Sequence, residues 1–115
     1  MIELDANRRA EAIEAGWLAY RERVADLEEA YRRACEAWEV IAVVESGAVI
    51  GALFVRADVI HLGIVPEWRG RWASRRVIRE MLSYGRKTTV GDDEAGCLSF
   101  VQRLGFERAG NEFHI

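Results

Sequence analysis

The stretch from Asp58 to Arg86 limits the fold more than any other part of the chain. Val59–Val65 is an apolar run of strand length, and a proline follows it directly. A turn that contains arginine and glycine comes next, and Trp72–Tyr84 then carries apolar side chains at helical spacing. The first N–H groups of a helix have no partner within the helix, and the helix dipole favours negative charge there. The stretch therefore predicts a strand, a turn and a helix that together form an anion-binding site.

Three β-rich runs lead up to this turn. They are Glu39–Glu45, Ala48–Val55 and Val59–Val65, and short breaks of two or three residues separate them. Runs this close together predict an antiparallel meander. Gly51 and Gly63 lie inside the predicted strands, where glycine often marks a bulge or the close approach of another backbone or a ligand.

The N-terminal part of the chain combines a short strand with a long helical pattern. Met1–Asp5 alternates apolar and polar side chains, which predicts a strand. From Ala10 to Trp38 apolar residues recur at helical spacing, so that one stripe is apolar and the rest is rich in arginine and glutamate. One long helix and two helices with a kink both fit this pattern, and so does a coiled coil. The aromatic and alanine side chains of the stripe favour packing against a sheet.

The C-terminal part predicts a further strand, a helix and a final strand or hairpin. Thr88–Val90 is a short strand pattern, and after a helical crossover it should lie parallel to the third strand of the meander. Glu94–Leu104 has an apolar helical face and ends at Gly105, and Phe106–Ile115 is again strand-like. The order β, long α, β, β, β, α, β, α, β predicts an α/β fold with a mixed sheet and helices on its faces, in a single domain of residues 1–115.

The distribution of charge narrows the choice of ligand. Residues 1–40 carry ten acidic residues and six arginines, a net charge of −4, whereas residues 69–87 carry seven basic residues and one glutamate, a net charge of +6. A compact basic segment in an acidic protein predicts a polyanionic small molecule or nucleic acid as its ligand. The acidic remainder argues against nucleic acid, because non-specific affinity for it is a sum over many phosphate contacts.

Composition also excludes two classes of site. The two cysteines, Cys35 and Cys97, lie far apart in sequence, and with only two histidines no metal-ligand spacing exists. The apolar runs are too short to cross a bilayer, and nothing resembles a signal peptide. We therefore expect a cytoplasmic protein without a metal or a membrane partner.

Two sequence landmarks resemble those of the GCN5-related N-acetyltransferase (GNAT) family. The family's motif A is a strand, often ending V-x-P, followed by [QR]-x-x-G-x-[GA] at the opening of a helix, and Ile64–Ser74 here reads IVPEWRGRWAS. The family's last helix closes on L-G-F, which corresponds to Leu104–Phe106, and the distance between the two landmarks also fits. The resemblance covers residues 38–110 through these landmarks and the N-terminal part through the order of its elements. It implies a GNAT-like fold with helices on both faces of a mixed sheet.

The resemblance implies acetyl-CoA as the cofactor and direct transfer of its acetyl group to an amine of a small molecule or protein. Ile64 and Val65 would then face the pantetheine, and the strand amide at about Val65 would stabilise the tetrahedral intermediate. Arg75 or Arg76 would add charge near the phosphates. The residues placed at the pyrophosphate are Arg69, Gly70, Arg71, Trp72, Ala73 and Ser74.

Trp72 and Ser74 depart from the motif, because they stand where the family has glycine and a small residue. Glycine there lets the backbone approach phosphate without a Cβ in the way. Either the Trp72 side chain turns into the core, or it fills the pocket, or a shifted register puts Ala73 in the small position. An R-G-R-W-A loop also resembles GNAT-like proteins of bacteriophages and prophages. A non-catalytic GNAT-fold structural or binding protein is therefore the alternative to an enzyme.

Acyl transfer needs a base for the acceptor amine and usually an acid for the departing thiolate. Many family members use as acid a tyrosine at the position of Val101, which the present chain lacks. Asp58 and His61 are the candidate bases. Asp58 also fits a turn, and His61 either carries a proton near neutral pH or is a buried strand histidine. The acidic cluster at residues 92–94 either receives a cationic amine or begins the last helix, where acids suit the dipole.

The length of the chain suggests an oligomer. At 115 residues it is short for the family, so we expect a trimmed sheet with exposed edges. Pairing with a second copy would cover one edge, which predicts a homodimer.

Overall fold

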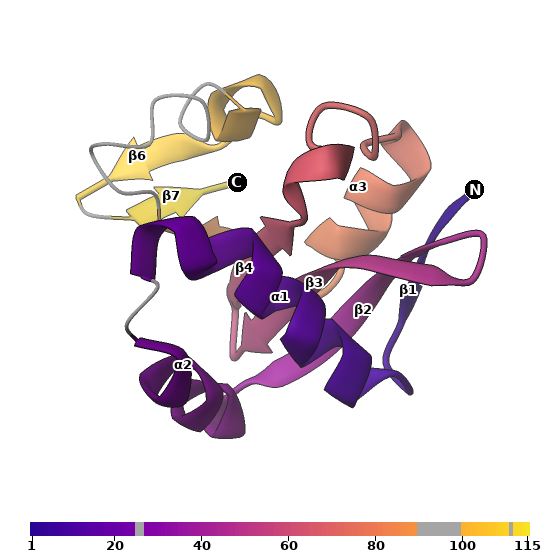
Figure 1. Ribbon diagram of the computed structural model, residues 1–115. Helices are drawn as coiled ribbons and strands as arrows, with labels where there is room; N and C mark the ends of the chain where they lie inside the picture. Colours follow the sequence, from indigo (N-terminus) through magenta and orange to yellow (C-terminus); the bar gives the residue numbers. More distant parts are fainter. Residues whose placement is uncertain (25–26, 90–99, 111) are drawn as a thin grey trace.

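The computed structural model describes residues 1–24, 27–89, 100–110 and 112–115. Within these residues seven strands form one mixed sheet in the order β1-β2-β3-β4-β5-β7-β6 (Figure 1). The α/β class and the mixed sheet expected from the sequence are confirmed. The elements are β1 (Ile2–Asp5), α1 (Arg9–Val24), α2 (Glu28–Ala34), a 3₁₀ turn (Cys35–Ala37), β2 (Glu39–Glu45), β3 (Ala48–Arg56), β4 (Val59–Ile64), a second 3₁₀ turn (Pro66–Trp68), α3 (Arg75–Leu82), β5 (Lys87–Thr88), β6 (Glu107–Ala109) and β7 (Glu112–His114).

The long helical pattern forms two helices that pack on the sheet. α1 ends at Val24 and α2 begins at Glu28, so the two-helix alternative is confirmed and the single long helix is wrong. Figure 1 shows α1 crossing one face of the strands, with α2 beyond its end. The core on this face combines helical and strand residues, and its buried members are Ala12, Cys35, Val40, Ala42, Val44, Ala52 and Phe54.

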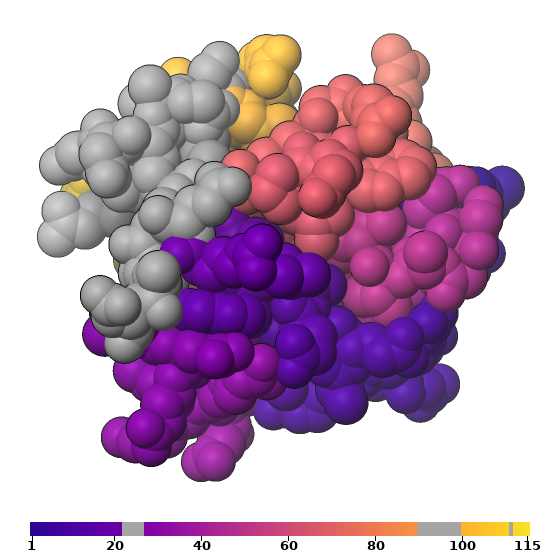
Figure 2. Space-filling model, in the orientation of Figure 1, coloured from indigo at the N-terminus to yellow at the C-terminus, as the bar shows by residue number. Residues whose placement is uncertain are grey.

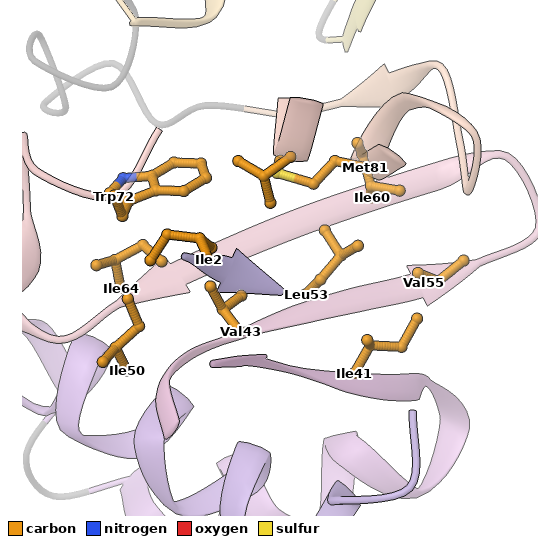
Figure 3. Packing of buried hydrophobic residues seen from close by; sticks show 11 residues of the cluster. Ile2, Ile41, Val43, Ile50, Leu53, Val55, Ile60, Ile64, Trp72 and Met81 are labelled. Atoms are coloured by element: carbon orange, nitrogen blue, oxygen red, sulfur yellow. The ribbon is translucent and has the colours of Figure 1, made fainter. Parts of the chain in front are cut away.

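The opposite face of the same strands forms the larger core, which includes α3. Ile41 and Val43 of β2 alternate with the residues that face α1, and they are fully buried. Figure 3 shows the aliphatic side chains of several strands meeting Trp72 from the turn before α3 and Met81 from α3 itself. Both faces of the central strands are therefore covered, which explains why β2 and β3 are apolar almost throughout.

The meander β2-β3-β4 is antiparallel as predicted, and it contains a bulge. Val43 pairs with Gly51 and Val44 with Val49, so Ile50 of β3 has no partner on β2. β4 pairs with β3 in register from Val59 to Ile64. The bulge lies beside the end of β4, at the point where the chain leaves the sheet for the turn that precedes α3.

The C-terminal elements follow the predicted order. β5 is parallel to β4 and begins at Lys87, one residue earlier than expected, whereas Val90 lies outside the described residues. The last helix is described from residue 100 onward, and it ends just before Gly105, whose φ of +99° favours glycine. β6 and β7 form the predicted hairpin. The first part of the helix expected over Glu94–Leu104, and the acidic cluster at 92–94, lie outside the described residues.

The helix after this turn begins at Arg75, so our expectation of Trp72 as its first residue is wrong. The chain first forms a 3₁₀ turn and then passes through Gly70 at a φ of +82°, which lengthens the connection. Ser74 is extended and caps α3, because its Oγ accepts a hydrogen bond of 3.3 Å from the Val77 N–H.

In the part of the chain that the structure describes, no helix is both long and apolar enough to cross a membrane.

Candidate functional site

Strand β4 begins beside strand β5. Among the described residues they pair at one position, Val59 with Lys87. The N–H groups of Arg86 and Lys87 both donate to the Asp58 carbonyl at 3.0 Å, and the Asp58 carboxylate accepts from the Arg86 N–H at 3.1 Å. Asp58 therefore holds the point at which the two strands meet, which gives this candidate base a structural role.

Beyond this point the backbone of β4 points away from β3 at two residues. The Leu62 carbonyl accepts a hydrogen bond of 3.0 Å from the Tyr20 hydroxyl, and the Ile64 carbonyl accepts one of 3.1 Å from Arg69 Nε. In a strand the N–H and C=O of one residue point the same way. The N–H groups of Leu62 and Ile64 therefore also point away from β3. No described backbone group accepts from these two N–H groups, which lie roughly 7 Å apart. We call these two residues the open edge of β4.

The amide of Val65 points in the other direction. Its N–H donates to the carbonyl of Ile50, the bulge residue of β3, at 2.9 Å. The donor that the sequence expectation placed at about Val65 is therefore already bonded, and the N–H of Ile64 is the donor at the end of the open edge.

The Trp72 side chain turns into the core. It is 6% exposed, and its ring lies 5.7 Å from the Phe100 ring at an angle of 56°. Figure 3 shows the indole above Ile64 and beside Ile2. The first of the three sequence alternatives therefore describes the structure, and the largest side chain of the turn does not lie on its outer side.

The backbone of the turn keeps unpaired donors around this tryptophan. The N–H groups of Trp68, Arg69 and Arg71 bond to carbonyls within the turn. No described group accepts from the N–H groups at 72–73 or from the first two of α3. A Cβ at Gly70 would meet no described atom within 4 Å, so the space directly beside it is open.

Arg69 ties the turn to the rest of the molecule. Its guanidinium donates to the Ile64 carbonyl through Nε and to the Ala19 carbonyl of α1 through Nη2, at 3.1 and 2.8 Å. The space-filling view shows the segment after β4 and α1 side by side on one face (Figure 2). Arg69 thus fixes the position of the turn through two carbonyl groups.

The other arginines near the turn have different surroundings. Arg71 lies 4.8 Å above the Trp68 ring and donates to the Glu67 carbonyl. Arg76 donates to the Ile2 carbonyl of β1 and lies near Glu80 of its own helix. Arg75, the first residue of α3, is exposed and has no hydrogen bond or ion pair with a described side chain.

A pocket that is largely open to solvent lies on the α1 side of β4. It has a volume of about 210 Å³, and we call it the aromatic cavity because rings form most of its wall. Four of its side chains, from Tyr20, Tyr31, Trp38 and His61, are partly exposed. The complete lining is Tyr20, Tyr31, Ala34, Cys35, Trp38, Phe54 and His61.

His61 is the candidate base that faces this cavity. Its ring lies 5.2 Å from the Trp38 ring, and burial lowers the pKa of His61 because it disfavours the charged imidazolium. The imidazole is therefore neutral at neutral pH and can accept a proton.

Among the described residues no group of His, Cys, Asp and Glu side chains has the arrangement of a metal site.

Sequence reasoning did not identify the cavity itself. Tyr20, Tyr31 and Trp38 belong to the apolar stripe of the N-terminal helices, and that stripe predicted only core packing. The Tyr31 hydroxyl donates to the Ile13 carbonyl at 2.7 Å, and burial raises the pKa of Tyr31.

Val101, at the position of the family's acid, is a buried core residue beside Phe106.

The chain matches no family model and no curated protein, but solved structures resemble it over nearly its whole length. YjaB from Escherichia coli, in its apo form, has a TM-score of 0.65 and 19% identity, and the match covers 96% of this chain and 85% of YjaB. PaiA N-acetyltransferase from Thermoplasma acidophilum, in complex with coenzyme A, has a TM-score of 0.62 and 16% identity over 98% and 96% of the two chains.

A third structure has a described substrate class. Mutant forms of the spermidine/spermine N-acetyltransferase SpeG from Vibrio cholerae match with a TM-score of 0.62 and 18% identity, over 96% of this chain and 82% of that one. Sequence identities this low show a shared fold. The present chain therefore has the GNAT fold that its turn motif implied.

Proposed function

We propose that this chain transfers an acyl group, with acetyl as the first choice, from a coenzyme A thioester to an amine. The observation that carries the proposal is the open edge of β4 beside a turn whose Trp72 points inward. Leu62 and Ile64 offer donors of the kind that an extended amide-containing chain can bind. The inward Trp72 favours the enzyme over the non-catalytic module, because it leaves the outer side of the turn clear.

The residues of the turn fit a pyrophosphate. No described group accepts from the backbone N–H groups at 72–73 and at the start of α3, and the dipole of the helix favours an anion there. Gly70 leaves open space, and the exposed Arg75 supplies a positive charge that no described side chain neutralises. Arg69 and Ser74 support the site indirectly, since the first holds the turn and the second caps the helix.

The reacting groups of the chain lie on β4. A bound acetyl-CoA would supply a thioester whose carbonyl carbon is open to attack by an amine. The Ile64 N–H would donate to the carbonyl oxygen as negative charge develops on it. His61, whose pKa is lowered by partial burial, would accept the proton of the acceptor amine. Asp58 stays at the strand junction, and a buried valine at 101 leaves the thiolate to be protonated by solvent.

Calorimetric titration with acetyl-CoA tests the cofactor site. We expect saturable binding, and we expect Arg75→Ala to weaken it by about three- to tenfold, because one charge-assisted contact contributes on the order of 1 kcal/mol. Arg79→Ala is the matched control, since it removes an exposed arginine from the same helix one turn later. Equal effects of the two variants would show that the start of α3 does not hold the phosphates.

A further inference from the structure

The two carbonyl groups of the open edge already accept hydrogen bonds from side chains. The Leu62 carbonyl accepts one of 3.0 Å from the Tyr20 hydroxyl, and the Ile64 carbonyl accepts one of 3.1 Å from Arg69 Nε. The N–H groups of the same two residues meet no described backbone acceptor. The edge of a strand ordinarily presents donors and acceptors together. Among the described residues this edge therefore presents donors, while its acceptors are occupied.

Packing holds both side chains against the strand. A Cβ at Gly63 would lie 3.0 Å from the Tyr20 ring and 3.2 Å from the Ala19 Cβ, so α1 packs directly on β4 between the two carbonyls. The centroids of the Tyr20 and Phe54 rings are 6.2 Å apart, which supports the tyrosine from its other side. Arg69 makes a second bond, of 2.8 Å, to the Ala19 carbonyl. Two consecutive residues of α1 therefore anchor both bonds to the edge.

These bonds make the carbonyls poor acceptors for a ligand. The Arg69 guanidinium has donors only and keeps its positive charge at physiological pH. A ligand N–H that approached the Ile64 carbonyl would point the positive end of its dipole toward this charge. At Leu62 a ligand N–H would have to share the carbonyl oxygen with the Tyr20 hydroxyl. Both positions therefore disfavour a ligand that donates.

An edge of this kind discriminates between two classes of extended chain. A β-strand pairs with an edge through its N–H groups and its carbonyls in turn. Here it would leave its own N–H groups without partners, and a buried donor without a partner is costly. A chain that binds through carbonyl oxygens satisfies the donors of Leu62 and Ile64 and can turn its N–H groups elsewhere. The arm of acetyl-CoA is such a chain, since its thioester and its two amides each carry a carbonyl.

We propose that Tyr20 and Arg69 determine the ligand specificity of the β4 edge, because they occupy its carbonyls and restrict it to chains that bind through carbonyl oxygens. This inference rests on the proposed coenzyme A site. Acetyl-CoA then binds the edge through its carbonyls alone, and its amide N–H groups make no bond to Leu62 or Ile64. Specificity is a difference of affinities, and here the difference comes from acceptors that the edge withholds.

The test replaces each amide of the acetyl-CoA arm in turn by an ester, which keeps the carbonyl and removes the N–H. Calorimetry gives Kd for acetyl-CoA and for each ester analogue, and we call the ester Kd divided by the acetyl-CoA Kd the N–H ratio. An ester carbonyl is also a weaker acceptor, but this contribution is common to all variants and cancels when their ratios are compared.

Tyr20→Phe should raise one of the two N–H ratios by at least about threefold over wild type, because the Leu62 carbonyl is then free to accept an amide N–H. The variant keeps the ring that packs on Gly63, so it should fold. Arg69→Met frees the Ile64 carbonyl and should raise a ratio in the same way. A merely structural role would weaken acetyl-CoA and its ester analogues equally, and ratios that stay at the wild-type value in both variants would overturn the inference.

Tyr31→Phe is the matched control. It also removes a phenol hydroxyl that donates to a backbone carbonyl, but that carbonyl belongs to Ile13 of α1 and not to the open edge. Its N–H ratios should equal those of wild type. A rise in Tyr31→Phe as large as that in Tyr20→Phe would overturn the inference, because the effect would then not depend on the Leu62 carbonyl.

The same titrations separate this inference from the proposed function. Binding of acetyl-CoA with equal N–H ratios in all variants would support the coenzyme A site and overturn the role of Tyr20 and Arg69. Absence of acetyl-CoA binding at millimolar ligand would contradict the proposed function and overturn the inference with it. Raised ratios in Tyr20→Phe and Arg69→Met, beside an unchanged ratio in Tyr31→Phe, would support both.

Discussion

Replacing Trp72 by alanine should destabilise the protein strongly, because its indole is a core side chain. It is 6% exposed and contacts the Phe100 ring in the larger core. Truncation of a buried tryptophan to alanine typically costs about 3–5 kcal/mol. Small domains have only about 5–15 kcal/mol of stability in total. With a urea m-value of about 2 kcal/mol/M, the unfolding midpoint should fall by about 2 M.

Urea unfolding followed by circular dichroism measures this loss. Trp68→Ala is the matched control, because Trp68 lies in the same turn but is only partly buried, and we expect a smaller loss there. The opposite expectation holds if the indole covers the phosphate site: Trp72→Ala would then keep the wild-type midpoint and bind acetyl-CoA more tightly. That result would refute the inward orientation and with it our reason for favouring an enzyme.

Three further predictions concern the cavity, pH and assembly. Gly16→Ala should cost about 1–3 kcal/mol and raise KM for the acceptor, because its Cβ would clash with Tyr31 and Phe54; unchanged melting and KM would contradict this packing. Burial lowers the pKa of His61, so the unfolded state binds the proton more readily, and stability should fall as pH drops below about 6.5. His61→Gln should reduce this loss, and identical pH profiles would contradict the shift. Light scattering should give the mass of a homodimer, whereas a stable monomer at high concentration would end that expectation.

Much of the fold followed from local patterns. The three strands of the meander, the glycine stop at 105 and the parallel crossover to β5 all depend on short runs and turn residues. Such signals act between neighbours in sequence, so they can be read from the chain directly. The start of α3 was missed because the turn before it uses a 3₁₀ segment and a left-handed glycine, which add length that helical periodicity does not show.

The candidate site was harder to predict, because long-range contacts decide its parts. The direction of Trp72 depends on the space left by Ile64 and Phe100, and the task of Arg69 depends on the Ala19 carbonyl fifty residues away. The aromatic cavity arises where two helices fail to fill the face of β4. The stripe at Tyr20 and Tyr31 looks the same in sequence whether its rings fill a core or line a cavity.

The most direct test of the central claim is an NMR titration of the uniformly ¹⁵N-labelled protein with acetyl-CoA. The account predicts saturable shifts of the backbone amides of Leu62 and Ile64, of the turn at 72–73 and of Arg75 at the start of α3. Amides of β1, which the proposed site does not include, should stay unchanged. Shifts confined to other surfaces, or no shifts at millimolar ligand, would contradict the claim that the open edge of β4 and the turn form a coenzyme A site.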